Sequence, residues 1–191
     1  LNQHGNLDKL KVRMCVRGDI QKLKCPDMED SHSPAAAFRM LKMFNGLAAQ
    51  RKAEPYQGDV VGAFLQATMR SRVIVKLNKY YGVVFPEYQD YCGRPLLLKK
   101  AMYGMTLSRK YWYQDCRDWL ISVGFQECPT CLVLFCKKEL DGSQLWLILY
   151  VDDFLYFYVN HFLVDRSEKA LAFSINRFLG GRGFSVGKTV V

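Results

Sequence analysis

Two adjacent carboxylates, Asp152 and Asp153, interrupt an otherwise apolar run, LWLILYVDDFLYFYV. They are flanked by Val151 and Phe154, whereas a turn that contains acids usually also contains Gly, Asn or Pro. Neighbouring carboxylates repel each other and favour a bound cation. Hard oxygen ligands at the tip of a hairpin suit Mg²⁺ or Mn²⁺. An exposed β-turn that carries two acids by chance is the alternative, and this run alone does not decide between them.

A third carboxylate, Asp59, lies in QGDVVGAFLQA, where a strand expected over 56–61 changes directly into a short helix. A carboxylate at a strand end beside the hairpin tip would bring three carboxylates together on two metal ions. Phosphoryl transfer uses this arrangement, because one metal activates the attacking hydroxyl and the other holds the leaving phosphate. The three carboxylates therefore predict metal-dependent phosphoryl transfer.

The composition indicates a folded chain with an anionic partner. The 191 residues carry a net charge of +9 with a pI near 9.2, and half of them are hydrophobic. An aromatic content of 14% excludes a disordered chain. A basic surface favours nucleic acid first and an anionic membrane second, although a basic surface can also serve solubility alone. No run approaches the ~20 apolar residues that cross a bilayer, so we expect no membrane span.

Basic charge is concentrated in residues 94–117, which hold six Lys or Arg and one acid, Asp115. Aromatic residues alternate with these cations, and this mixture is typical of nucleic-acid binding. The alternative is an amphipathic helix with its rings in the core, and we prefer it for Trp112 and Trp119.

Seven cysteines are scattered along the chain, an odd number that favours reduced thiols and an intracellular setting. Cys128, Cys131 and Cys136 have the first two gaps of a zinc knuckle. A fourth ligand should follow, but Asp141 stands at that position, so we expect free thiols rather than zinc.

The elements that must position the carboxylates follow from local patterns. We expect an antiparallel pair of strands over 131–137 and 144–151, joined by the turn at 140–143. Further expected elements are a basic hairpin or strand over 9–24, a helix opened by Ser33-Pro34, strands over 72–77 and 96–98 with a loop over 78–95, and helices over 108–124 and 162–179.

Six stretches together resemble a known family. Tyr150-Val151-Asp152-Asp153 resembles the YxDD box of reverse transcriptases, and GDVVGAFL is similar to their first palm motif. Four further stretches follow in the order of the copia-type LTR retrotransposon branch, and the resemblance covers roughly residues 5–180. They are LDKLKVRMCVRGDIQ, SPAAAFRMLKMFNGLAAQ, LLLKKAMYGMTLSRKYWYQDCRDWLISVGF and CPTCLVLF.

The resemblance implies an α+β fold: a palm of antiparallel strands with the YVDD hairpin and helices behind it, plus a basic fingers lobe. It assigns residues 1–54 and 68–95 to the fingers, 55–67 and 96–160 to the palm, and 161–191 to a truncated palm helix and tail. No stretch resembles the family's thumb, ribonuclease H or integrase, so we expect the thumb to be missing.

The resemblance also implies a site. Asp59 and Asp152 would be the principal ligands of two Mg²⁺ ions, or of Mn²⁺, with Asp153 as the third carboxylate and the carbonyl of Val60 completing one metal site. Phe64 occupies the position of an aromatic sugar gate that would select deoxynucleotides. The alternative for Phe64 is a core aromatic on a short helix.

Four further residues fall where the family contacts the incoming nucleotide. Gly104 lies in the loop along the nucleotide and template, and Lys11, Arg13 and Arg17 lie on the fingers strand. A cation there would hold the triphosphate, and Arg13 is our first choice. The family usually has Lys-Gln-(Ser/Ala)-Pro-Arg after its Tyr-Gly-Leu, whereas this chain has TLSRK at 106–110 and no proline.

The implied function is RNA-directed DNA synthesis with deoxynucleoside triphosphates on a primed RNA or DNA template. The implied context is a polyprotein with ribonuclease H and integrase, in a cytoplasmic virus-like particle. A degenerate, inactive retroelement remnant that at most binds nucleic acid is the main alternative. A stand-alone metal-dependent nucleotidyltransferase on a similar palm is another.

Overall fold

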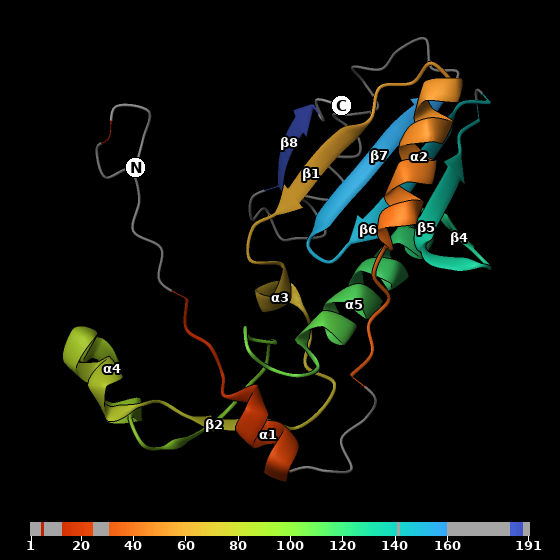
Figure 1. Cartoon of the computed structure of the whole chain (residues 1–191). Coiled ribbons are helices and arrows are strands. Elements are labelled where there is room, and N and C mark those ends of the chain that lie inside the picture. The colour runs from red at the N-terminus through yellow and green to blue at the C-terminus, as the bar shows by residue number, and fades with distance from the viewer. Residues whose placement is uncertain (1–4, 6–12, 25–30, 141, 160–183, 189–191) are drawn as a thin grey trace.

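A six-stranded antiparallel sheet organises the chain (Figure 1). The structure is a computed structural model that describes residues 5, 13–24, 31–140, 142–159 and 184–188. In spatial order the strands are β4 (Gln126–Cys128), β5 (Cys131–Lys138), β6 (Gln144–Tyr150), β7 (Asp153–Val159), β1 (Tyr56–Val60) and β8 (Phe184–Lys188). The antiparallel sheet with its helices confirms the expected α+β class.

The centre of this sheet is tightly packed. Helix α2 (Phe38–Gln50) lies against it, and the Phe44 ring meets Phe157 of β7 with ring centroids 4.6 Å apart. On the neighbouring strand Trp146 stacks on Phe157, because the two residues are cross-strand partners. Phe157 is fully buried. The strands are therefore held by burial of large rings, which also fixes their register.

Helix α5 (Ser108–Ser122) supplies the second large packing surface. Its Tyr111, Trp112 and Leu120 are almost fully buried, so the expectation that Trp112 belongs to the core is confirmed. The short helix α3 (Ala63–Gln66) follows β1 and contacts α5. Gly124, with φ of +95°, follows the end of α5, in a conformation that glycine adopts without strain.

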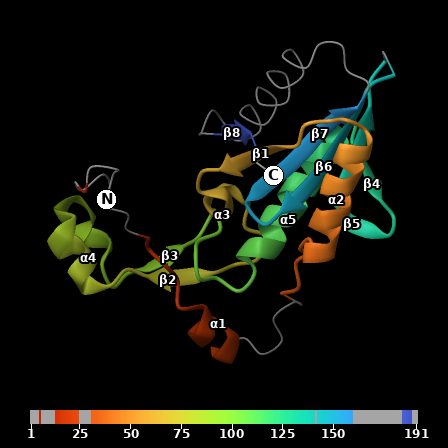
Figure 2. The ribbon, with the colours of Figure 1, turned by 45° about the horizontal axis from the view of Figure 1, so that its top comes forward.

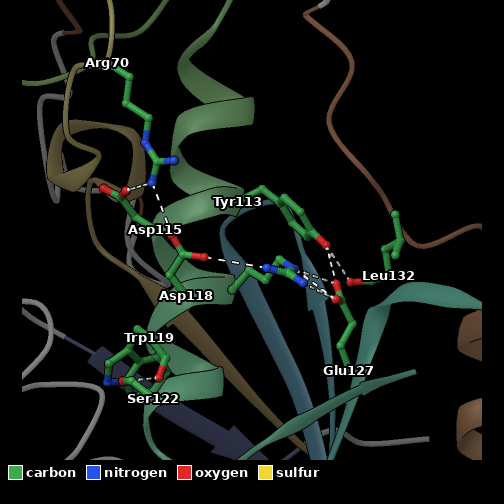
Figure 3. Close-up of polar contacts among 9 residues, drawn as sticks. Arg70, Tyr113, Asp115, Asp118, Trp119, Ser122, Glu127 and Leu132 are labelled. Atoms are coloured by element: carbon green, nitrogen blue, oxygen red, sulfur yellow. Dashed lines mark hydrogen bonds and ion pairs between the residues drawn. The ribbon is translucent and has the colours of Figure 1, made fainter. Parts of the chain in front are cut away.

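Residues 70–100 form an arm that projects away from the six-stranded sheet (Figures 1 and 2). It contains a two-stranded sheet of β2 (Ile74–Lys76) and β3 (Pro95–Leu97), the helix α4 (Lys79–Val84) and the 3₁₀ helix η1 (Pro86–Tyr91). At its base, the backbone N–H of Thr68 donates to Asp115 of α5 at 2.7 Å. The guanidinium of Arg70 donates to the same carboxylate at 2.8 Å (Figure 3). Helix α5 therefore anchors the arm.

The expectation of a long loop over 78–95 is wrong, because this stretch forms α4 and η1. Asn78 caps α4 by accepting a hydrogen bond from the backbone N–H of Tyr80 at 3.0 Å. The ring of Tyr81 then contacts both Phe85 and Tyr88. The local cap and ring contacts outweigh the loop-forming composition of this stretch.

Two other expectations are wrong, and a third falls on residues that the structure does not describe. Residues 18–24 form helix α1 (Gly18–Lys24) rather than a strand, and Asp19 in its first turn suits the positive end of a helix. Helix α2 begins at Phe38 rather than at Ser33-Pro34, because the Ser33 hydroxyl donates to the carbonyl of Arg109 instead of capping. The helix expected over 162–179 lies outside the described residues.

The domain division drawn from the sequence remains a prediction, although α2, which it places with the fingers, packs on the six-stranded sheet. Within the described ranges, no helix is both long and apolar enough to span a bilayer.

Candidate active site

Strand register brings Asp59 and Asp153 together. The two residues are Cα partners where β1 pairs with β7, although they are distant in sequence. Asp153 also closes the β6–β7 hairpin opposite Tyr150, which leaves Val151 and Asp152 in the turn. The backbone N–H of Val60 donates to the carbonyl of Asp152 at 3.2 Å. The end of β1 and the hairpin turn thus form one corner of the sheet, which we call the carboxylate corner (Asp59, Asp152, Asp153).

The turn at this corner is strained. Val151 has φ of +58°, in the left-handed region that a β-branched residue rarely occupies. Such a conformation costs about 1–3 kcal/mol and persists only when its surroundings enforce it. The indole N–H of Trp112, on α5, donates to the carbonyl of Val151 at 2.7 Å. Because Trp112 is itself buried, its hydrogen bond fixes the turn that carries Asp152.

The carboxylate corner has an excess of negative charge. Partial burial raises the pKa of Asp153, and the charges of Asp152 and Asp59 raise it further. A hydrogen bond from the Gln57 side chain to Asp153, at 3.3 Å, acts in the opposite direction. The charges of Asp59 and Asp152 therefore destabilise the charged form of Asp153, and a cation at this corner would relieve that repulsion.

The metal site expected at this corner remains a prediction. Among the described residues, no group of three or more His, Cys, Asp or Glu side chains is placed to hold a metal ion. The donors nevertheless fit a hard divalent cation in chemistry, since they are carboxylate oxygens on adjacent backbone positions.

Two rings and one cation form a row beside this corner. Phe64 on α3 meets Tyr103 edge to face, with ring centroids 5.6 Å apart. The guanidinium of Arg13 lies over the Tyr103 ring at 5.4 Å from its centroid. Two of the residues expected to contact a nucleotide, Arg13 and Phe64, are thus linked through Tyr103. Phe64 is half-buried and packs against the edge of the core, and its role as a sugar gate remains a prediction.

Gly104 lies where the backbone of residues 13–18 crosses the loop at 102–106. The backbone N–H of Val16 donates to the carbonyl of Tyr103 at 2.8 Å. Gly104 has φ of +83°, and a Cβ at this position would collide with the carbonyl oxygen of Val16. Only glycine permits both the conformation and this close approach.

Two of the cations that we expect to hold a triphosphate, Arg13 and Arg17, differ in their surroundings. Arg17 forms a two-pronged hydrogen-bonded ion pair with Asp19, at 2.9 and 2.7 Å. Arg13 lies over Tyr103, as described above. Lys11 lies outside the described residues. Because its charge is already paired, Arg17 is a weaker candidate for a triphosphate than Arg13.

Comparison with known proteins decides the family. A sequence model described as reverse transcriptase (RNA-dependent DNA polymerase) matches residues 2–178. The chain belongs to this reverse transcriptase family. It is 30% identical over 154 residues to the retrovirus-related Pol polyprotein from transposon RE2 of Arabidopsis thaliana, covering 81% of this chain and 10% of that protein.

Other copia-type Pol polyproteins are also similar to this reverse transcriptase chain. The polyprotein from transposon RE1 of Arabidopsis thaliana is 28% identical, over 81% of this chain and 10% of its own length. The polyprotein from transposon TNT 1-94 of Nicotiana tabacum is 26% identical, over 78% of this chain and 11% of its own length. The chain thus spans about a tenth of these relatives. No solved structure matches it.

Sequence reasoning missed three residues that shape this candidate site, namely Gln57, Trp112 and Tyr103. Gln57 contacts Asp153, and its place two residues before Asp59 on an alternating strand was a usable signal. Trp112 was assigned to the core without its hydrogen bond to the hairpin turn, and nothing in the sequence indicates that bond.

Tyr103 is one of the aromatic residues in the basic stretch 94–117, and its contacts with Phe64 and Arg13 depend on tertiary packing. A small pocket of about 40 Å³ lies beside the turn, lined by Phe64, Trp112 and Val151 among others.

Proposed function

We propose that this chain is the catalytic segment of an RNA-directed DNA polymerase. In this reaction, the primer 3′-hydroxyl attacks the α-phosphate of a deoxynucleoside triphosphate, and pyrophosphate leaves. One observation carries the proposal: in a chain of the reverse transcriptase family, strand register sets Asp59 opposite Asp153, beside the turn that holds Asp152.

Asp59, Asp152 and Asp153, with the carbonyl of Val60, would hold two Mg²⁺ ions, or Mn²⁺. When bound, these ions would activate the attacking hydroxyl and neutralise charge on the leaving pyrophosphate. The protein contributes position: β1 and the strained turn hold the carboxylates on one corner, and Gln57 orients Asp153 by its hydrogen bond.

We propose that the row beside the corner binds the incoming nucleotide. The guanidinium of Arg13 would pair with phosphate oxygens, since a planar cation suits them. The ring of Phe64 would pack against the sugar and leave no room for a 2′-hydroxyl. Gly104 would let the backbone of the 102–106 loop approach the base pair closely.

The relatives are Pol polyproteins, and this suggests a setting for the chain. We propose that it acts on a primed RNA or DNA template as part of a longer polyprotein that also contains ribonuclease H and integrase. The family further suggests reverse transcription in a cytoplasmic virus-like particle.

Single-nucleotide addition to a radiolabelled primer–template tests the polymerase proposal, because it needs one turnover rather than processive synthesis. With Mg²⁺ and deoxynucleotides, we expect the chain to extend the primer, and Asp59→Asn and Asp152→Asn each to reduce the rate by orders of magnitude. Asp90→Asn, on the arm, is the matched control and should leave the rate unchanged. Circular dichroism should show that all variants fold.

Binding of Mn²⁺, followed by water-proton relaxation, gives a second measure that needs no activity. We expect Asp152→Asn to weaken Mn²⁺ binding and Asp90→Asn to leave it unchanged. If the folded wild-type chain neither binds Mn²⁺ nor adds a nucleotide, the chain is an inactive remnant. If Asp152→Asn extends primers normally, the metal assignment is wrong.

A further inference from the structure

The hairpin of β4 and β5 contains a pair of cysteines that the proposed polymerase reaction does not use. Its turn has the sequence Cys128-Pro129-Thr130-Cys131, in which two residues separate the thiols. Cys128 and Cys131 are Cα partners across this turn. Antiparallel partners have Cα atoms about 4.5–5.5 Å apart, within the roughly 4.4–6.8 Å that a disulfide spans. The backbone already has the spacing for a bond between the two sulfurs.

The two thiols are reachable but not freely mobile. Both cysteines are half-buried and both are free thiols in the structure. The strand register shifts between Glu127 and Cys128, so the cysteine pair closes a tight turn of its own. By contrast, Cys136 is the partner of Gln126, beyond this shift, and Cys116 is fully buried on α5. Among the described cysteines, Cys131 is thus the partner that the register gives Cys128.

Contacts with α5 hold both sides of the turn (Figure 3). On one side, the guanidinium of Arg117 donates hydrogen bonds to the carboxylate of Glu127, the shortest at 2.6 Å. On the other side, the hydroxyl of Tyr113 donates to the carbonyl of Leu132 at 2.7 Å. Glu127 and Leu132 are the immediate neighbours of the two cysteines. The helix therefore limits how far the thiols can separate.

The surroundings of Cys128 favour it as the attacking thiol. A hydrogen bond with the Thr130 hydroxyl, together with hydrogen bonds from the backbone N–H groups of Thr130 and Cys131, lowers the pKa of the Cys128 thiol. Burial instead raises the pKa of Cys136. A lower pKa increases the fraction of reactive thiolate near neutral pH.

We propose that Cys128 and Cys131 form a dithiol site that exchanges with low-molecular-weight disulfides of the glutathione class. The Cys128 thiolate attacks one sulfur of the external disulfide, whose S–S bond breaks and releases one thiol. Cys131 then attacks the Cys128 sulfur of the mixed disulfide and releases the second thiol. Two electrons and two protons pass from the pair to the external disulfide, which leaves as two thiols.

Mass spectrometry can test this on the whole chain. The chain is equilibrated in glutathione buffers of increasing oxidised fraction, quenched with acid, alkylated and digested with trypsin. Cleavage after Arg117 and Lys137 gives one peptide, 118–137, with all three hairpin cysteines. We expect a form of this peptide in which a disulfide joins Cys128 to Cys131 and Cys136 is alkylated. This form is lighter by two hydrogen atoms than the same peptide with Cys128 and Cys131 as free thiols.

Three variants assign the roles. Cys131→Ser should trap a glutathione adduct on Cys128, because the second attack is lost. Cys128→Ser should abolish the internal disulfide. Cys136→Ser is the matched control and should leave its formation unchanged. A disulfide to Cys136, or glutathione adducts with no internal disulfide in the wild type, would overturn the proposal.

A parallel titration in urea shows whether the fold prepares the pair. We expect the ratio of internal disulfide to dithiol, at a given glutathione buffer, to fall at least several-fold when the chain unfolds, since unfolding releases the turn from α5. An equal ratio in both states would show that the spacing alone, rather than the folded hairpin, accounts for the reaction, and would contradict the structural proposal.

Discussion

The six-stranded sheet and the arm differ in what holds them. In the sheet, rings such as Phe157 are fully buried and contact residues from distant parts of the chain. In the arm, many apolar side chains face solvent: Val83 is 73% exposed and Tyr80 is 64% exposed. Local features shape the arm, namely the Asn78 cap and the ring contacts of Tyr81. Long-range burial therefore stabilises the sheet, whereas the arm depends on short-range contacts and on its anchor at Asp115.

The rigid packing of the sheet suits the role that we propose for the carboxylate corner. The carboxylate corner needs fixed positions, and it lies on the sheet, where register is enforced by burial. The arm contacts its anchor through polar groups that remain partly exposed. An element held in this way can shift at lower cost than a strand of the core.

Truncation of one phenylalanine in each region gives the largest expected contrast. Phe157→Ala removes a ring between Phe44 and Trp146 and should lower the free energy of unfolding by about 3–5 kcal/mol. Phe85→Ala, in the arm, removes a ring that is 41% exposed and should cost about 1 kcal/mol. Urea denaturation followed by fluorescence measures both. Equal losses would mean that the arm is as tightly packed as the sheet.

A pair of glycine substitutions examines the close approach of residues 13–18 to the loop at 102–106. Gly104→Ala combines a positive φ with a collision against Val16, and should destabilise the chain by about 2–4 kcal/mol. Gly93→Ala is the matched control: its φ is +76°, but a Cβ there meets nothing within 4 Å. It should cost about 1–2 kcal/mol from backbone strain alone. Thermal unfolding measures the difference, and equal losses would show that the Val16 contact is not maintained in solution.

The smallest expected effect lies at the carboxylate corner. The folded state raises the pKa of Asp153, so it binds this proton more tightly than the unfolded chain does. Stability should therefore fall as pH rises through the window just above the ordinary aspartate pKa of about 3.9. Asp153→Asn removes this dependence and should stabilise the metal-free chain at pH 7 by less than about 1 kcal/mol, because solvent screens partly exposed charges.

Denaturation at pH 4 to 7 (roughly the titration window) checks this sign. Asp90→Asn, on the arm, should not change the slope. Added Mg²⁺ should stabilise the wild type more than Asp153→Asn, since the cation relieves the same repulsion. If Asp153→Asn is less stable than the wild type at pH 7 without metal, the excess of negative charge at the carboxylate corner is contradicted.

The sequence predicted the sheet much better than the arm. The strands β5, β6 and β7 have continuous apolar patterns, and the interruption at Asp152 and Asp153 located the turn between the last two. Tyr, Gly and Pro in residues 78–95 favoured a loop, because composition does not show that Asn78 caps a helix or that the rings stack. Helix α1 was missed for a similar reason, since alternating basic and apolar residues are also typical of a strand.

The candidate site was predictable to the extent that single residues carry the chemistry. Asp59 and the Asp152–Asp153 pair could be selected by type and by their places at strand ends. The pairing of Asp59 with Asp153 is a property of sheet order, and β1 lies next to β7 only in the folded chain. The link from Arg13 through Tyr103 to Phe64 joins three separate segments, so local pattern could not reveal it.

Val151 connects this architecture to the history of the gene. Glycine would adopt its left-handed conformation without penalty, so Val151→Gly is a substitution that eases folding while it loosens the turn beside Asp152. In copies of an element that must still replicate, selection for activity opposes that exchange. In copies that no longer replicate, nothing opposes it, and position 151 should vary, with glycine and asparagine among the residues that accumulate. The residue at this one position, compared across genomic copies, would then distinguish lineages under selection from decaying ones.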